Sequence, residues 1–157
     1  MGTQPIAQVS ATALHNVGQR AKALDYTYGE AEFIYHPCAA SAAAGDLVVY
    51  DEKNALTTQA QRGSRGSIGV AMAAGVSGSY GWFAVQGSVP VSTVDGAAKL
   101  GPGFLSTTAG SVSSLQSEGE RLEGLTLVAQ PSSSFVTCRL SNPCASGSFL
   151  LVSEKVL

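Results

Sequence analysis

Glycine and proline interrupt this chain so often that few stretches are left in which a helix could form. There are 18 glycines and 6 prolines in 157 residues, and the longest interval free of both runs from Asp46 to Arg62. Even this interval opens with the β-branched, alternating sequence DLVVYD, which favours a strand. Because both residues are unfavourable inside helices and frequent in turns, their spacing predicts a mainly β fold built from short strands.

Eight segments combine apolar or β-branched residues with turn signals at both ends. They are Ala31–His36, Asp46–Asp51, Ser67–Ala73, Gly81–Val89, Ala98–Leu105, Leu125–Gln130, Ser134–Leu140 and Ser148–Ser153. The pair Asp95-Gly96 predicts a tight hairpin turn, and the polar stretch from Arg62 to Gly66 predicts a loop. About eight short strands in a single domain predict a small β-barrel or a sandwich.

The first 25 residues have a different texture from the rest of the chain. Apolar residues recur there at intervals of three or four, a spacing that permits one weak helix, but no capping box accompanies it. We therefore expect an N-terminal arm over residues 1–25, extended or weakly helical, followed by a β-rich domain over residues 26–157.

Charge and hydropathy exclude several classes of partner. The formal net charge is only −2 and there is no basic cluster, which argues against a nucleic-acid surface. No stretch approaches the roughly 18 apolar residues of a spanning helix, and the start lacks the pattern of an export signal. We expect a chain made in the cytoplasm that binds neither membrane nor nucleic acid.

The residues that usually carry catalysis or bind metals are few. His15 and His36 are the only histidines, so a small hydrolase is a weak alternative. His36 with Cys38, Cys138 and Cys144 could supply four zinc ligands, yet their spacings are not those of paired zinc knuckles. We predict buried thiols, no metal, no cofactor and no enzymatic activity.

Several phrases of the sequence, taken in order, resemble one known family. They are GDLVVYD from Gly45, GSIGVAMA from Gly66, YGWFAVQG from Tyr80, LGPGFLSTTAGSV from Leu100 and FVTCRLSNP from Phe135. Together they are similar to the decoration or cement proteins of tailed-bacteriophage heads, over most of the chain between about residues 30 and 140. The Gly-Pro-Gly at Gly101–Gly103 departs from the commoner Gly-Asp of that family, and the N-terminal segment matches no part of it.

The resemblance implies a small β-barrel or β-tulip domain, usually trimeric, on the exterior of the virion. Such a protein would bridge subunits of the major capsid protein and catalyse no reaction. The expected partners are therefore the major capsid protein and further copies of this chain. A carbohydrate-binding or receptor-binding β domain of a phage fibre or surface protein is the main alternative.

Apolar residues of the arm and aromatic residues near strand ends are the candidates for contact with the capsid or a neighbouring subunit. On a strand, Tyr80 and Trp82 share one face while Phe83 and Val85 share the other, so the two pairs cannot enter one core. Either one pair faces a partner, or both faces are covered within the chain. The candidate residues are Ile6, Val9, Leu14, Val17, Tyr26, Tyr28, Tyr80 and Trp82.

Overall fold

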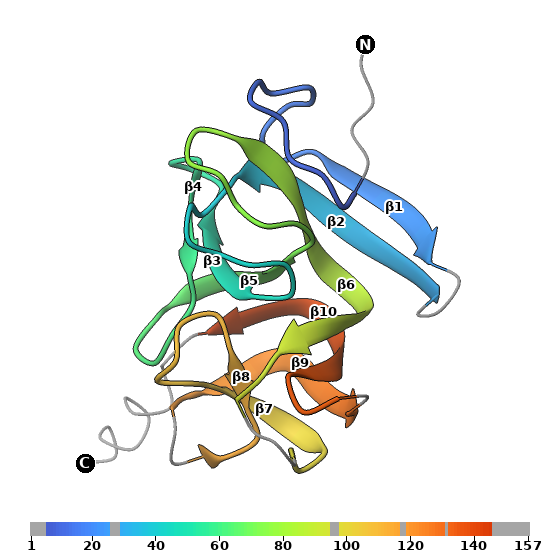
Figure 1. Cartoon of the computed structure of the whole chain (residues 1–157), viewed down its shortest axis with the longest axis vertical. Helices are drawn as coiled ribbons and strands as arrows, with labels where there is room; N and C mark the ends of the chain where they lie inside the picture. The colour runs from blue at the N-terminus through green and yellow to red at the C-terminus, as the bar shows by residue number, and fades with distance from the viewer. Residues whose placement is uncertain (1–5, 26–28, 95–97, 117–118, 131, 146–157) are drawn as a thin grey trace, which may run out of the picture.

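The chain forms one antiparallel sheet of ten strands (Figure 1). The computed structural model describes residues 6–25, 29–94, 98–116, 119–130 and 132–145. The strands are β1 Arg20–Asp25, β2 Gly29–Pro37, β3 Leu47–Asp51, β4 Leu56–Gln59, β5 Gly66–Ala71, β6 Tyr80–Ser92, β7 Gly101–Leu105, β8 Val112–Ser113, β9 Arg121–Ala129 and β10 Phe135–Ala145.

The hydrogen-bonded order is β1-β2-β6-β5-β10-β9-β7-β8, with β3 pairing β4 and β5, and β6 also pairing β10. The mainly β prediction is confirmed. A closed barrel is one of the expected architectures. Among the described strands, however, β8 does not pair with β1, so the sheet is not closed into a barrel. The described residues include no helix of the length and apolarity that a membrane crossing requires.

The predicted strands between residues 31 and 140 are all present, several with longer bounds and five of them shorter at one end: β3 begins at Leu47, β5 ends at Ala71, β7 begins at Gly101, β9 ends at Ala129 and β10 begins at Phe135. The loop at residues 62–65 is also present, whereas the predicted strand Ser148–Ser153 and the Asp95-Gly96 turn lie outside the described residues. Sequence patterns missed three strands. β1 contains alanine, lysine and aspartate, β4 has only four residues, and β8 has two, so pairing with neighbours rather than propensity determines them.

The N-terminal segment forms no helix in its described part. Its last six residues form β1, which pairs in full register with β2, from Arg20 opposite Ile34 to Asp25 opposite Gly29. The segment expected as an arm therefore contributes a strand to the same sheet as the residues after it.

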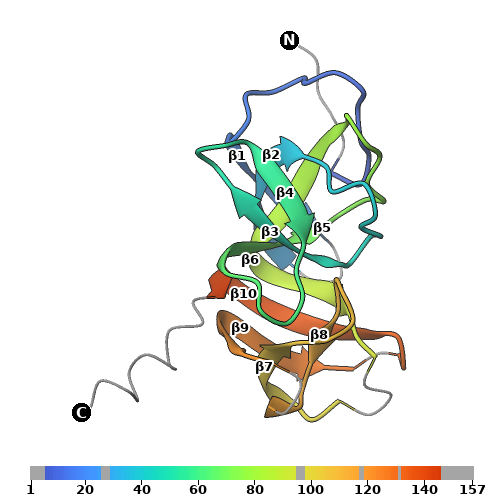
Figure 2. The ribbon, with the colours of Figure 1, turned by 90° about the vertical axis from the view of Figure 1, so that its left-hand side faces the viewer.

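β6 joins two parts of the sheet: one formed by β1 to β5, and the other formed by β7 to β10. Its first half pairs with β2 and β5, and its second half pairs with β10 (Figure 2). Trp82 and Ala84 point into the main core in the first half, but Val89 and Val91 do so in the second. The inward positions therefore change from even to odd numbers between these pairs. Gly87 lies at this change with φ +103°.

β10 makes a similar change near its end. Val136, Cys138 and Leu140 enter the main core, and then Ala145 does, after a shift in the pairing register between Leu140 and Cys144. Asn142, with φ +46°, lies within that shift. Beyond it, β10 leaves β6, pairs with β9 at Glu123, and on its other side pairs with Gly66 and Ser67 of β5.

Two apolar clusters occupy opposite faces of the part of the sheet formed by β2 and the first half of β6. Phe33, Tyr35 and Trp82 belong to the main cluster, which continues through β9 and β10. Ile34 and Phe83 belong to the second cluster, together with Val85 and residues of β3 and the loop before it. The prediction that alternating residues of β6 serve separate faces is confirmed, and both faces are covered within the chain.

The turn of β6 at Gly87 gives a test of the fold. A Cβ there would lie 2.7 Å from the carbonyl oxygen of Glu30 and 2.9 Å from Ala31, and the φ angle disfavours any side chain. We expect Gly87→Ala to lower the free energy of unfolding by about 3 kcal/mol, from strain and crowding together, as measured by urea unfolding.

Gly63→Ala is the matched control, because Gly63 has φ +91° but nothing within 4 Å of its Cβ position. In this variant only backbone strain destabilises the fold, and we expect the free energy of unfolding to fall by about 1 kcal/mol. Equal losses in the two variants would contradict the close approach of β6 to β2.

Candidate binding surfaces

Four rings gather at the start of β6 and the middle of β2. Tyr35 is fully buried, Trp82 is 4% exposed, and their ring centroids are 5.0 Å apart. His15 lies 5.1 Å from both rings, and Tyr80 stacks on Tyr35 at 6.2 Å. This aromatic cluster is part of the chain's own packing.

The N-terminal segment runs over this aromatic cluster and is fixed there by backbone hydrogen bonds. Ser10 and Tyr80 exchange two bonds, with N···O distances of 2.9 and 2.8 Å. The amide of Gly18 donates to the carbonyl of Tyr35 at 2.7 Å, and the amide of Tyr35 donates to Gln19 at 2.9 Å. Removal of the segment would therefore leave backbone groups of β2 and β6 without these partners.

The structure brings several predicted interface residues together within one chain. Ile6 and Tyr80 pack against the main core, and Trp82 is buried. Val9 lies against Gly81, 3.3 Å from the position of a Cβ on that residue. Leu14 is half-buried, and its amide donates to the Tyr35 hydroxyl at 3.1 Å.

The other candidates differ in placement. Val17 is 38% exposed and so retains surface for a partner. Tyr26 and Tyr28 lie outside the described residues. Among the predicted residues that the structure describes, Trp82 has the least surface left for contact with another protein.

The histidine and cysteine side chains form no metal-binding group among the described residues. No three potential His, Cys, Asp or Glu ligands come together in that part of the chain. Cys138 is buried, and burial raises the pKa of its thiol to about 12. Cys38 and Cys144 are half-buried free thiols, and burial raises the pKa of each.

Three exposed apolar side chains lie near the end of the sheet at which four strands begin or end. β6 and β9 finish at this end, and β7 and β10 start there: Phe135 pairs with Ser92, and Gly101 with Leu127. Val94 is 54% exposed, Leu100 is 52% exposed and Phe135 is 37% exposed. We call Val94, Leu100 and Phe135 the apolar end. Sequence patterns did not single it out, because strand register alone places these residues at a common end.

Comparison with known proteins gives no relative for this chain. No family model, curated protein or solved structure matches it.

His36 provides a pH test of the fold. Its side chain is fully buried beside Tyr50, and neither ring nitrogen has a hydrogen-bond partner among the described residues. Desolvation lowers the pKa of His36 below 6.5, although the nearby carboxylates of Glu52 and Asp51 act in the opposite direction. The unfolded chain therefore binds more protons than the folded chain just below pH 6.5.

From this sign we expect the His36 contribution to stability to be complete above about pH 6.5 and to be lost as the pH falls toward the lowered pKa. One proton limits its slope to about 1.4 kcal/mol per pH unit. Urea unfolding of wild type and His36→Phe between pH 5 and 8 measures it. Identical pH slopes for the two proteins would contradict the assignment to His36.

Proposed function

We propose that this chain is a structural protein of a tailed-bacteriophage head. It binds the outer surface of the capsid and stabilises the head by bridging subunits of the major capsid protein. It is made in the host cytoplasm and acts on the exterior of the virion. The observation that carries the proposal is the apolar end, which gives the chain a surface suited to contact with another protein.

The apolar end has the character of a small protein contact. Isolated apolar side chains are common on protein surfaces, but Val94, Leu100 and Phe135 come from separate segments and share one end of four strands. Covering these three side chains removes apolar area from water, which favours contact with a partner.

The family resemblance supports the proposal from a different direction. The similar phrases contain or lead into successive elements of the sheet: Gly45 precedes β3, Gly66 opens β5, Tyr80 opens β6, Gly101 opens β7 and Phe135 opens β10. The last phrase includes Asn142, where β10 changes its pairing. The phrases therefore coincide with positions at which the fold starts or turns a strand.

Attachment through small surfaces becomes firm when several copies are joined. Linking three weak contacts raises the effective concentration of the second and third, provided that all three reach the capsid together. A trimer would supply this arrangement, and it is the oligomer that the family resemblance implies.

The first test of this function is the size of the free protein. We expect light scattering at micromolar concentration to give about three times the subunit mass of 16.0 kDa. A monomeric mass that persists when the concentration is raised would contradict a stable trimer in solution.

The second test addresses the apolar end. We expect the double variant Val94→Ser with Leu100→Ser to bind undecorated heads of the source phage at least about tenfold more weakly than wild type, because both side chains would be covered in the complex. Co-sedimentation with heads measures binding, and thermal melting checks that the variant is folded.

Leu56→Ser is the control, because Leu56 is 60% exposed at the start of β4, away from the apolar end. It should bind heads as wild type does. Equal binding by the double variant and wild type would remove the apolar end from the mechanism, and failure of wild type to bind heads would overturn the proposed function.

The carbohydrate-binding alternative gains no specific support from the described residues. A sugar site usually combines an exposed aromatic ring with polar groups, but Trp82 and Tyr35 are buried in the aromatic cluster, and the exposed ring of Phe135 lies at the apolar end.

A further inference from the structure

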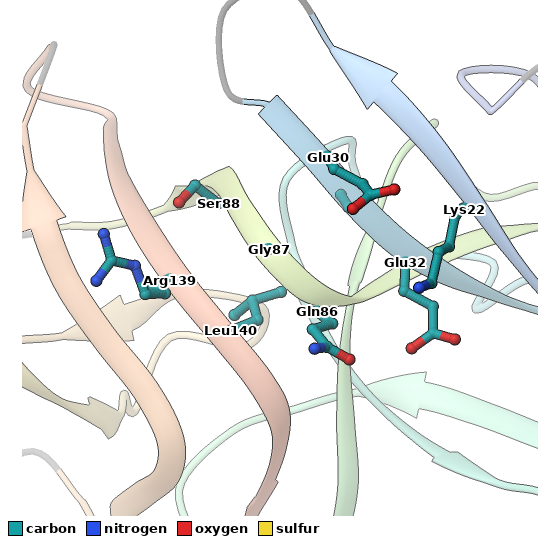
Figure 3. A pocket seen from close by; sticks show the side chains of 9 residues that line it. Lys22, Glu30, Glu32, Gln86, Gly87, Ser88, Arg139 and Leu140 are labelled. Carbon is teal, nitrogen blue, oxygen red and sulfur yellow. The ribbon is translucent and has the colours of Figure 1, made fainter.

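A polar cleft of about 300 Å³ opens where β6 turns at Gly87 (Figure 3). β1 and β2 provide one wall, with Lys22, Glu30 and Glu32, and β10 provides the other, with Arg139. The floor is formed by backbone and small or apolar residues between these walls. The remaining lining residues are Ala31, Gln86, Gly87, Ser88 and Leu140.

The cleft exists because one face of the sheet extends beyond its cover. On β2, Ile34 is buried in the second apolar cluster, but Glu32 and Glu30, further along the same face, are partly or largely exposed. On β6, Val85 is buried, and the next residue, Gln86, is exposed opposite Glu32. The polar residues therefore begin where the packing of β3 and β4 against this face ends.

Gly87 brings the walls together without filling the space between them. A Cβ at this position would meet the backbone of Glu30 and Ala31, so a glycine is needed for β6 to pass this close to β2. The backbone then continues along β10, where Ser88 pairs with Arg139. Glu30, Glu32 and Lys22 thus lie on one side of the glycine turn, and Arg139 lies on the other side, with its guanidinium directed away from Gly87 (Figure 3).

The charges on the two walls are satisfied to different degrees. Glu32 forms an ion pair with Arg20 at 3.8 Å, and Arg20 also donates to the Oδ1 atom of Asn142 at 3.1 Å. Glu30 and Arg139 are exposed and form no ion pair with any described residue. Lys22 also forms no ion pair with a described residue, so one side of the cleft offers the Glu30 carboxylate and the Lys22 ammonium, and the other side offers the Arg139 guanidinium.

We propose that this cleft receives a protruding polypeptide segment of the capsid protein that carries a basic and an acidic side chain. The basic group pairs with Glu30, and the acidic group pairs with Arg139, whose planar fork suits a carboxylate. The assignment to the capsid protein rests on the proposed function. The charge pattern that selects the segment rests on the cleft itself.

Other occupants fit the cleft less well. An apolar ligand would strip water from four charged side chains without replacing their interactions. A second copy of this chain would need a protrusion of complementary charge, because two concave surfaces cannot fill each other. A dipolar polypeptide segment matches both the charges and the open shape.

The experiment compares charge-neutral variants inside and outside the cleft. We expect Glu30→Gln and Arg139→Gln each to weaken binding to undecorated heads by about tenfold, since each removes one charge pair repeated in every attached copy. Glu123→Gln and Arg121→Gln are matched controls, because both side chains are exposed on β9 outside the cleft. They should bind as wild type does, and all four variants should melt as wild type does.

A second measurement needs no capsid. The probe is the peptide acetyl-Ala-Arg-Ala-Asp-Ala-amide, which in an extended form presents both charges on one face. In a nuclear magnetic resonance titration we expect it to shift the backbone amide signals of Gly87 and Ser88. The shifts should diminish in Glu30→Gln and in Arg139→Gln.

These two measurements separate the cleft from the proposed function. If wild type binds heads and the cleft variants bind equally well, the cleft proposal is wrong and the proposed function stands. If the peptide shifts the cleft amides but wild type does not bind heads, the proposed function is wrong and the cleft retains its charge selectivity. Absence of any peptide shift, or a change in oligomeric mass in the cleft variants, would overturn the cleft proposal.

Discussion

The turn of β6 at Gly87 is the constraint on which the rest of the sheet depends. A strand normally keeps its odd and even residues on fixed faces, yet β6 must place Trp82 and Ala84 in the core first and Val89 and Val91 later. The positive φ of Gly87 permits that exchange, and the missing side chain lets β2 lie alongside. Both β2 and β10 can then pair with the same strand, and one main core spans the two parts of the sheet.

Before this turn, the two faces of the sheet have different covers. Where Phe83 and Val85 point, β3 and the loop before it complete an apolar cluster. Where Tyr35 and Trp82 point, the N-terminal segment lies across the rings. Past the turn neither cover continues, and the exposed face carries the charges of the polar cleft. The residues at this uncovered place, such as Glu30 and Gln86, are polar, as expected for side chains that face water.

Local patterns in the sequence predicted the mainly β fold and the central strands well. The alternation around Val48 and the opposed faces of Trp82 and Phe83 are properties of neighbouring residues, so they can be read without a structure. β1 could not, because its alanines, lysine and aspartate form a strand only through pairing with β2. The apolar end and the polar cleft depend on register between strands that are distant in the sequence, and local residue patterns do not determine that register. Sequence reasoning pointed to Ile6 and Trp82 as surfaces for partners, and long-range packing uses them inside the chain.

The hydrogen bonds between Ser10 and Tyr80 can form only late in the synthesis of the chain. Seventy residues separate these partners, and at about 5 to 20 residues per second their synthesis is separated by roughly 4 to 14 s. Ser10 is therefore among the first described residues to be made, but it can be fixed only after β6 emerges. During that interval the rings of Tyr35 and His15 have no Trp82 to pack against. The packing of these rings, like the Ser10–Tyr80 pairing, is therefore completed only after the first half of the chain has been made.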